Sequence, residues 1–246
     1  MRIAFLSDIH ANRDALDACL RHARERGADR LAFLGDYVGY GADAADAVER
    51  VASEVAQGAV AVKGNHDEAM ERRVGYFNDA ASAALDWARA TLTPAHRAFL
   101  AGLPLCLHEP PLCFVHASAA APERYDYIDS AAAARRCASA AGQPFTFVGH
   151  VHDQMLYYES TRGRMLPFRP VAGTAIPVGV HRRWIAIVGS VGQPRDRNPA
   201  GAYAVLDTAR NELTFHRVPY DHRAAAERIR RAGLPESLAY RVEMGI

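Results

Sequence analysis

Short apolar runs alternate with amphipathic stretches along the first part of the chain. Residues 2–7, 31–34 and 59–62 are mostly apolar and have the length of buried strands. Residues 14–26 and 43–57, between these runs, have the apolar spacing of helices that bury one face. Strands that alternate with helices predict βαβ units, so we expect a parallel sheet here.

The rest of the chain departs from this regular alternation. Thr93 and Pro94 are the residue types that favour a helix start, and mostly strands are predicted after residue 152. No internal repeat, low-complexity tract or linker interrupts the chain, so we expect one domain over residues 1–246 with two sheets. Helices are predicted at about residues 79–91, 93–100, 130–140 and 223–231, and strands at 112–115, 145–148, 155–159, 164–168, 184–188, 202–206 and 212–218.

Residue types that ligate metals follow five of the predicted strands. The motifs are Asp8-Ile9-His10, Gly35-Asp36, Gly64-Asn65-His66-Asp67, His116 and Gly149-His150-Val151-His152. Because the carboxyl ends of strands in an open parallel sheet share one edge, we expect these side chains to lie together. In the Asp-x-His and His-x-His motifs, alternate residues point the same way if the backbone stays extended, so both members of each pair could reach one ion.

The donor types restrict the chemistry of the expected site. Carboxylate, imidazole and amide ligands without thiolates favour manganese, iron or zinc, and magnesium or nickel is also compatible. Seven candidate ligands, namely Asp8, His10, Asp36, Asn65, His116, His150 and His152, are too many for one four-coordinate ion. They fit two ions about 3.5–4 Å apart that share one carboxylate. The alternative, in which each is an ordinary loop residue, needs a coincidence at every one of these strand ends.

In their order and spacing, these motifs resemble those of the calcineurin-like metallophosphoesterases, and residues 189–195 resemble a segment of the compact bacterial members. The resemblance implies an α/β fold, a four-layer α/β/β/α sandwich in which helices flank two mixed β-sheets. It also implies roles for the candidate ligands. Asp8, His10 and His152 would hold one ion, Asn65, His116 and His150 would hold the other, and Asp36 would bridge the two.

The activity that this resemblance implies is the hydrolysis of phosphate esters. A hydroxide that bridges the two ions would attack the phosphorus in line, without a phosphoenzyme intermediate. His66 would not be a ligand; it would face the phosphate, stabilise the developing charge and protonate the leaving oxygen. We expect the substrates to be phosphodiesters or phosphomonoesters of small molecules or nucleotides.

One segment departs from the family pattern. The related serine/threonine protein phosphatases have Gly-Asp-Tyr-Val-Asp-Arg-Gly where this chain has Gly-Asp-Tyr-Val-Gly-Tyr-Gly at residues 35–41. In those relatives the second aspartate orients the catalytic histidine and the arginine binds phosphate, whereas this chain has Gly39 and Tyr40. Asp67 is the neighbouring candidate to orient His66. Since Tyr40 cannot form a charge-assisted fork to phosphate, we expect small diesters or nucleotides to be better substrates than phosphoproteins.

Other functions are compatible with the same fold. A serine/threonine-type protein phosphatase or a dinucleoside-polyphosphate hydrolase would use the same metal centre on a different phosphate bond. A non-catalytic scaffold would keep the fold and lose part of the site, whereas here all the candidate ligands and His66 are present. A small helical insert at about residues 79–100 would wall the site and influence the choice among substrates.

Two polar residues near the motifs each allow two interpretations. Asn12 could bind the substrate phosphate, or it could cap the helix that begins near residue 14. Arg195, in the segment Gln193-Pro194-Arg195-Asp196, could bind phosphate or stabilise a turn.

The overall charge and the absence of long apolar runs limit the partners. Lys and Arg number 29 and Asp and Glu number 28, so the net charge of +1 creates no strong field for a polyanion. We therefore expect no dedicated nucleic-acid surface. The apolar run at the first residues is too short for a signal peptide, and no apolar stretch approaches the roughly 20 residues that span a bilayer. Together with four cysteines that lack Cys-x-x-Cys spacing, these features predict a cytoplasmic protein without a membrane partner.

Overall fold

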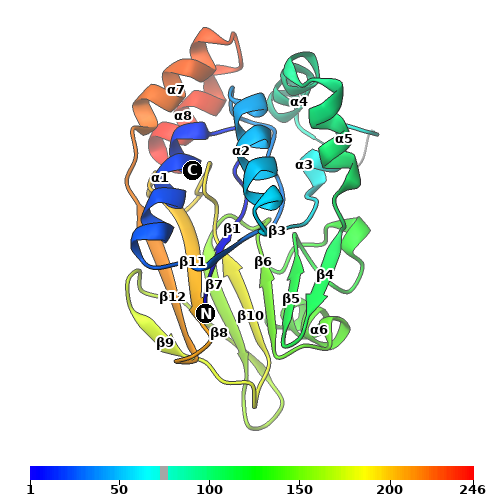
Figure 1. Cartoon of the computed structure of the whole chain (residues 1–246), viewed down its shortest axis with the longest axis vertical. Helices are drawn as coiled ribbons and strands as arrows, with labels where there is room; N and C mark the ends of the chain where they lie inside the picture. The colour runs from blue at the N-terminus through cyan, green and yellow to red at the C-terminus, as the bar shows by residue number, and fades with distance from the viewer. Residues whose placement is uncertain (73–76) are drawn as a thin grey trace.

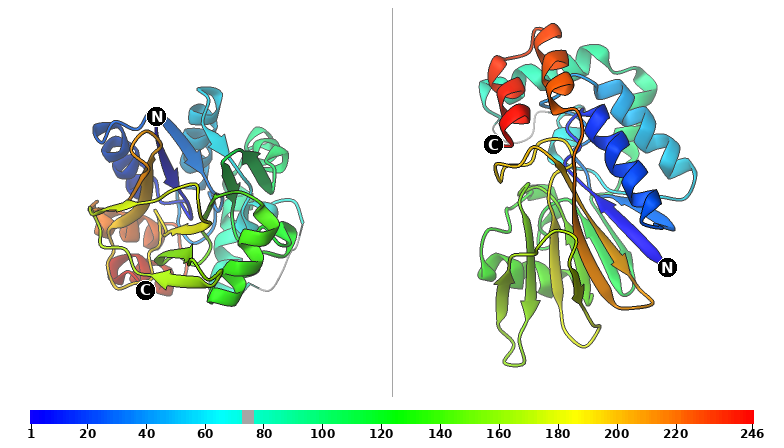
Figure 2. Two further views of the ribbon diagram at one scale, coloured as in Figure 1. Left: turned by 90° about the horizontal axis from the view of Figure 1, so that it is seen from below. Right: turned by 90° about the vertical axis from the view of Figure 1, so that its left-hand side faces the viewer.

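The computed structural model describes residues 1–72 and 77–246, and within them two six-stranded sheets lie face to face. Helices cover the outer face of each sheet, as Figure 1 and the side view in Figure 2 show. The α/β/β/α sandwich implied by the motifs is confirmed. The first sheet has the order β3 (Val60–Ala61), β2 (Arg30–Phe33), β1 (Arg2–Leu6), β11 (Gly201–Asp207), β12 (Glu212–Val218) and β9 (Ala175–Pro177). The second has the order β4 (Cys106–Glu109), β5 (Leu112–Val115), β6 (Phe145–Val148), β10 (Trp184–Val188), β7 (Gln154–Glu159) and β8 (Met165–Phe168).

Both sheets are mixed, because crossovers place some strands in parallel and hairpins place others antiparallel. In the first sheet β1, β2 and β3 are parallel, as predicted, and α1 (Arg13–Glu25) and α2 (Ala44–Ala56) connect them. β11 and β12 form an antiparallel hairpin that pairs with β1, so the predicted parallel arrangement covers only part of this sheet. In the second sheet β5, β6 and β10 are parallel, and α6 (Ala131–Ala141) connects the first two.

The other helices lie at the end of the molecule that carries the loops after β1, β2 and β3 (Figure 1). They are α3 (Asn65–Glu68), α4 (Asp79–Thr91), α5 (Pro94–Gly102), α7 (His222–Arg231) and α8 (Glu236–Met244), with a 3-10 turn at Pro122–Arg124 elsewhere in the chain. Within the described residues, every helix is too short or too polar to cross a bilayer.

Most of the predicted elements are present, with ends within one or two residues of those expected. The apolar pattern does not predict β4, β9, α3, α8 or the 3-10 turn. β4 and β9 are short edge strands with exposed or half-buried residues, so their pairing with β5 and β12 determines their conformation. α8 buries only Leu238, Ala239 and Val242, which is too short a stripe to give a clear helical period.

Aromatic side chains fill the space between the two sheets. Phe5 of β1 stacks on Phe147 of β6, with ring centroids 3.5 Å apart and ring planes at 8°. Phe114 of β5 lies 5.9 Å from the ring of Phe5, and all three side chains are buried. Burying one such ring stabilises a fold by roughly 1.5–3 kcal/mol. This aromatic layer therefore holds the ends of β1, β5 and β6 close to one another.

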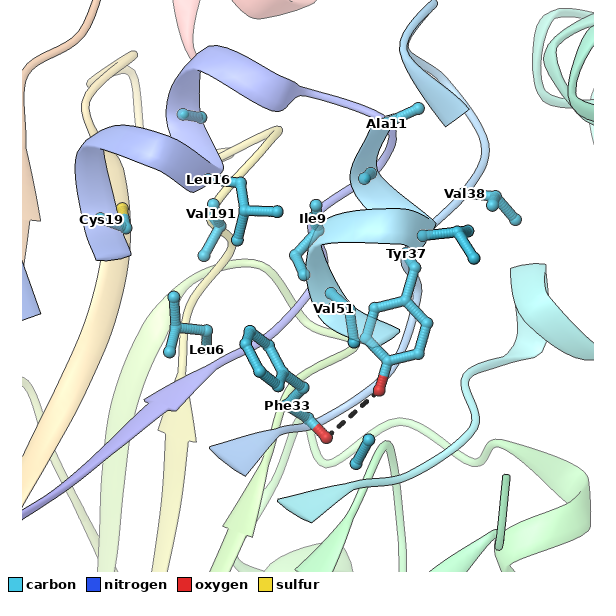
Figure 3. Close-up of a cluster of buried hydrophobic side chains, with 14 of the residues drawn as sticks. Leu6, Ile9, Ala11, Leu16, Cys19, Phe33, Tyr37, Val38, Val51 and Val191 are labelled. Carbon is cyan, nitrogen blue, oxygen red and sulfur yellow. Dashed lines mark hydrogen bonds between the residues drawn. The ribbon is translucent and has the colours of Figure 1, made fainter. Parts of the chain in front are cut away.

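A second apolar layer lies between the first sheet and helices α1 and α2, and Figure 3 shows part of it. Val51 of α2 packs in this layer with Phe33 of β2. Tyr37 is buried there too, and its hydroxyl lies 2.7 Å from Val62 O and 3.3 Å from Phe33 O. The layer therefore fixes the loop after β2, which carries Asp36.

Candidate metal centre

The polar residues that follow five strands meet at one end of the two sheets. Asp8 and His10 follow β1, Asp36 follows β2, Asn65 begins α3 after β3, His116 follows β5, and His150 and His152 follow β6. The expectation of one sheet edge is wrong in one respect, because β5 and β6 belong to the second sheet. The side chains meet because the two sheets lie face to face, so the site is built at an edge that both sheets share.

The backbone at these strand ends is left-handed and not extended. The φ angles are 53° at Asp8, 49° at His10, 58° at Asp36, 65° at His150 and 70° at His152. The expectation that an extended backbone directs both members of each motif to one ion is therefore wrong. A non-glycine residue in this region costs about 1–3 kcal/mol, a cost that the surrounding structure must offset. Such strain at five neighbouring polar positions is typical of a functional site.

Asp8, His10 and His152 form the first group of donors. Asp8 Oδ1 lies 3.2 Å from His152 Nε2 and 3.7 Å from His10 Nε2, and the two imidazole nitrogens are 3.1 Å apart. All three side chains are buried. An ion bonded at about 2.0–2.2 Å keeps its ligands roughly 3–4 Å from one another, so these separations suit a shared ion.

Asp36, His116 and His150 form the second group of donors, to which Asn65 adds an amide oxygen. His116 Nε2 lies 3.3 Å from Asp36 Oδ2 and 3.1 Å from His150 Nδ1. It also lies 3.2 Å from Asn65 Oδ1. Asp36 Oδ2 is 3.8 Å from His10 Nε2 in the first group, so this carboxylate lies between the two groups, where a bridging ligand is needed.

Backbone carbonyls orient three of the imidazoles. His10 Nδ1 lies 3.2 Å from Val38 O, and His116 Nδ1 lies 2.7 Å from Leu34 O. His152 Nδ1 lies 2.6 Å from Gln193 O. Each of these contacts requires the N–H on Nδ1, since a carbonyl oxygen only accepts. The lone pair of a neutral ring is then on Nε2 and points toward the donor group, as in metal-ligating histidines.

Burial and charge act against each other in the site. Burial lowers the pKa of His66 to about 4 and that of His150 to about 3, so both rings are neutral at pH 7. Burial also lowers the pKa of His116, but the Asp36 carboxylate outweighs it and raises that pKa to about 9. His152 and His116 hold the pKa of Asp8 below its usual range in spite of its burial. The carboxylates therefore stay ionised and attract a cation, which would compete with protons for the imidazoles.

The donor set fits divalent ions that prefer nitrogen and oxygen ligands, because it combines carboxylates, imidazoles and one amide without a thiolate. A separate group of sulfur and nitrogen ligands lies on β4 and β5. There Cys106 Sγ lies 3.6 Å from Cys113 Sγ and 3.4 Å from His108 Nε2. A count of bound metal must therefore distinguish a soft ion on these thiols from ions at the centre.

His66 lies beside the donors and is not part of either group as the motifs assign them. Its Nε2 is 4.0 Å from Asp36 Oδ2, and its ring is packed by Tyr40 and Phe77, with centroids 4.7 and 4.9 Å away. Its buried Nδ1 has no hydrogen-bond partner among the described residues. A Cβ atom on Gly39 would lie only 2.2 Å from this Nδ1, so the ring packs directly against the Gly39 backbone and leaves no space there for a side chain.

The hydrogen bonds that the Asp67 carboxylate makes among the described residues come from backbone N–H groups and not from the His66 ring. Its Oδ2 accepts hydrogen bonds from the backbone N–H of Asp36 at 2.8 Å and of Gly64 at 2.9 Å, and its Oδ1 accepts from Tyr37 N–H at 2.9 Å. Burial, together with Asp36, raises the pKa of Asp67 to about 7. The carboxyl group therefore ties the loop after β2 to the start of α3 and has a structural role.

Asn12 caps α1, so its contacts support the helix cap, one of its two interpretations. Its Oδ1 accepts a hydrogen bond from Ala15 N–H at 3.2 Å at the start of α1. Its Nδ2 donates to Gly192 O and to the Tyr220 hydroxyl, both at 2.9 Å. Both hydrogens of the amide are used, and the side chain is buried. It has no donor left for a phosphate.

A cavity of about 320 Å³ opens beside the two donor groups, and Arg195 reaches it. Arg195 Nη2 lies 3.2 Å from Gln193 Oε1 and 3.4 Å from the Tyr40 hydroxyl. The sequence offers no signal for several other lining residues, since each is an isolated position outside any motif. The cavity is lined by Asp36, Tyr40, Asn65, His66, Phe77, Asn78, Ala81, Tyr127, His150, His152, Arg195 and Arg241.

Comparison with known sequences gives a match over most of the chain. A sequence model described as the calcineurin-like phosphoesterase superfamily domain matches residues 1–211. An uncharacterised protein of Methanocaldococcus jannaschii is 31% identical over 254 residues, which cover 99% of this chain and 98% of that protein.

Comparison with solved structures agrees with the sequence match. A metallophosphoesterase from Sphaerobacter thermophilus is 36% identical, with a TM-score of 0.88 over 100% of this chain and 99% of that one. A hypothetical protein from Pyrococcus horikoshii has a TM-score of 0.80 over 100% of this chain and 98% of that one, at 19% identity. At that lower identity the likeness shows the fold alone.

Proposed function

Because the chain belongs to the calcineurin-like phosphoesterase superfamily, we propose that it is a hydrolase that cleaves small phosphate esters or nucleotides with a binuclear metal centre. Manganese, iron or zinc suits the donors best. In this proposal Asp8, His10 and His152 hold one ion, Asn65, His116 and His150 hold the other, and Asp36 bridges them.

The observation that carries the proposal is the position of Asp36. Its Oδ2 lies 3.3 Å from His116 Nε2 in one donor group and 3.8 Å from His10 Nε2 in the other. Its Oδ1 accepts the backbone N–H of His66 at 2.9 Å, which holds the carboxylate in this position. A carboxylate that faces two sets of imidazoles is the arrangement that a pair of ions requires.

Two divalent ions would supply Lewis acidity and lower the pKa of water, the nucleophile of phosphoester hydrolysis. The chain itself would orient the ester and protect it from the solvent. His66 lines the cavity next to Asp36, so its N–H is placed to donate to the phosphate or to the leaving oxygen. Packing by Tyr40 and Phe77 would keep the ring in that orientation.

We further propose that the helical segment at residues 79–100 belongs to the same domain and walls the substrate cavity. Phe77, Asn78 and Ala81, just before and in the first turn of α4, line the cavity together with Asp36, His150 and His152. A cavity of about 320 Å³ is at the small end of the range for small-molecule pockets, so it favours a small ester over a protein surface.

The test is hydrolysis by the chain after its metals have been removed and manganese has been added back. We expect release of nitrophenol from 4-nitrophenyl phosphate or its bis-ester, and loss of both metal and activity in Asp36→Ala. Asp86→Ala is the matched control, since Asp86 is an exposed carboxylate on α4 whose one partner among the described residues is Arg89. Full metal content without hydrolysis of any phosphate ester would refute the proposed activity and favour a scaffold.

A further inference from the structure

Arg195 comes close to the position where the related protein phosphatases have an arginine and this chain has Tyr40. The two residues are 155 apart in the sequence, yet Arg195 Nη2 lies 3.4 Å from the Tyr40 hydroxyl. The guanidinium carbon lies 5.7 Å from the centroid of the Tyr40 ring. The loop after β10 therefore delivers a cation to the same wall of the cavity.

The guanidinium of Arg195 has only neutral partners in the described part of the chain. It makes hydrogen bonds to the Tyr40 hydroxyl and Gln193 Oε1 and lies beside the Tyr127 side chain, and no carboxylate lies within 4.0 Å of it among residues 1–72 and 77–246. Its Nε is buried and has no hydrogen-bond partner there. Buried polar groups are normally paired, and a guanidinium pairs best with an anion that accepts two parallel hydrogen bonds.

The place of Arg195 in the cavity indicates which anion it meets. Arg195 lines the same cavity as Asp36, His66, His150 and His152, so an ester held at the metal centre lies within the space that the guanidinium faces. The planar fork of an arginine matches two non-bridging oxygens of one phosphate. A phosphomonoester or a terminal nucleotide phosphate offers such oxygens and carries two negative charges. A diester also has two non-bridging oxygens, but it carries only one negative charge.

We propose that Arg195, held by Tyr40, binds the phosphate of the substrate and makes a dianionic phosphate the preferred substrate class. This inference rests on the proposed phosphoesterase activity, and it selects, among the small esters and nucleotides expected from the sequence, those with a dianionic phosphate. Arg195 binds the phosphate directly, whereas Tyr40 positions the guanidinium.

The test compares Arg195→Gln with Arg135→Gln in the manganese-loaded protein. Arg135 is an exposed arginine on α6, so its substitution removes the same charge outside the cavity. The affinity for inorganic phosphate is measured by calorimetry. The kcat/KM values are measured on 4-nitrophenyl phosphate and on bis(4-nitrophenyl) phosphate, and metal content and Tm are recorded for both variants.

We expect Arg195→Gln to weaken phosphate binding by about 10- to 100-fold, the range for a lost hydrogen bond to a charged group. In Arg195→Gln the kcat/KM on the monoester should fall by a similar factor, and the kcat/KM on the diester should fall by less than about threefold. Arg135→Gln should match the wild type in all three measurements. Unchanged phosphate affinity, or an equal fall on both esters with metal content intact, would overturn the inference. If the wild type hydrolyses neither ester, the proposed function fails, while the phosphate affinities still test Arg195 separately.

Discussion

Gly39 lies directly against His66, so close that a Cβ atom on Gly39 would be 2.2 Å from His66 Nδ1. The related protein phosphatases have an aspartate at this position, but here the imidazole itself occupies the space that a side chain would need. The backbone of Gly39 also has a φ of 85°, which side chains rarely adopt.

We therefore predict that Gly39→Ala displaces the His66 ring and lowers kcat/KM by about 100-fold, the effect of misplacing a reacting group by about 1 Å. Gly58→Ala is the control, because Gly58 has a φ of 101° and nothing within 4 Å of its Cβ position. Both variants should lose about 1–3 kcal/mol of stability through backbone strain, but only the first should lose activity. Equal activity in the two variants would contradict the packing argument.

A second prediction separates the metal ligands from the group that faces the substrate. His66→Ala should keep its metal and lower kcat by about 10²–10⁴-fold, because the ring would act on the ester and not on the ions. Asp36→Ala should lose metal and activity together. Elemental analysis and steady-state kinetics on the same preparations distinguish a metal ligand from a group that acts on the ester. Loss of metal from His66→Ala would show that His66 is a ligand.

A third prediction concerns metal content. We expect about two ions per chain after dialysis against manganese, since two donor groups share Asp36. Ligand binding stabilises a fold by about 2.7 kcal/mol at 100 times the Kd, so chelation should lower Tm and manganese should restore it. Cys106→Ser should leave the manganese count unchanged, because the group with His108 and Cys113 suits a softer ion. A count of one ion or fewer, with no shift in Tm, would contradict the two-group arrangement.

A fourth prediction tests the structural role of Asp67. Asp67→Ala would leave three buried backbone N–H groups without an acceptor, at about 1–3 kcal/mol each. We expect a loss of several kcal/mol of unfolding free energy in urea, and a smaller loss in Asp67→Asn, which keeps one acceptor oxygen. A variant with unchanged stability and a lowered kcat would instead support the orientation of His66 by Asp67.

A fifth prediction concerns Asn12. Asn12→Ala should lower stability by about 0.5–2 kcal/mol through the lost cap, and KM should stay within about twofold of the wild type. Ser130→Ala removes an equivalent cap from α6 on the other side of the molecule and is the matched control. A tenfold rise in KM for Asn12→Ala alone would restore a substrate-binding role.

The parts of the fold that the sequence predicts are those in which local pattern and final environment agree. β1, β5 and β6 are mostly apolar because they are buried between layers, so each is visible as a short apolar run. β4 and β9 gain their conformation from pairing with β5 and β12, and nothing in their own residues distinguishes them from loops. The antiparallel pairing of β11 with β1 is likewise a long-range property without a local signal.

In the candidate site, too, the sequence predicts what depends on local pattern and misses what depends on contacts between distant segments. The ligand types are visible because they follow strands, but the left-handed backbone at Asp8 and Asp36 depends on contacts with other loops. The contacts of Asp67 have no local signal either, because an aspartate can accept from an imidazole or from backbone amides, and only the folded loop decides between them. The contact between Tyr40 and Arg195 joins segments that are distant in the sequence, and the residues around each of them give no sign of it.

The two sheets that share the metal centre also set the order in which it can form. The first donor group needs Asp8 from one sheet and His152 from the other, and the second needs Asp36 and His150 in the same way. A chain growing from its N-terminus therefore lacks the second group until residue 150 has been made and the first until residue 152 has been made, and β1 still lacks its partner β11 at that point. Each ion would then cross-link the two sheets and would bind late in biosynthesis. An N-terminal fragment that ends before β6 would lack ligands from both donor groups and could hold neither ion.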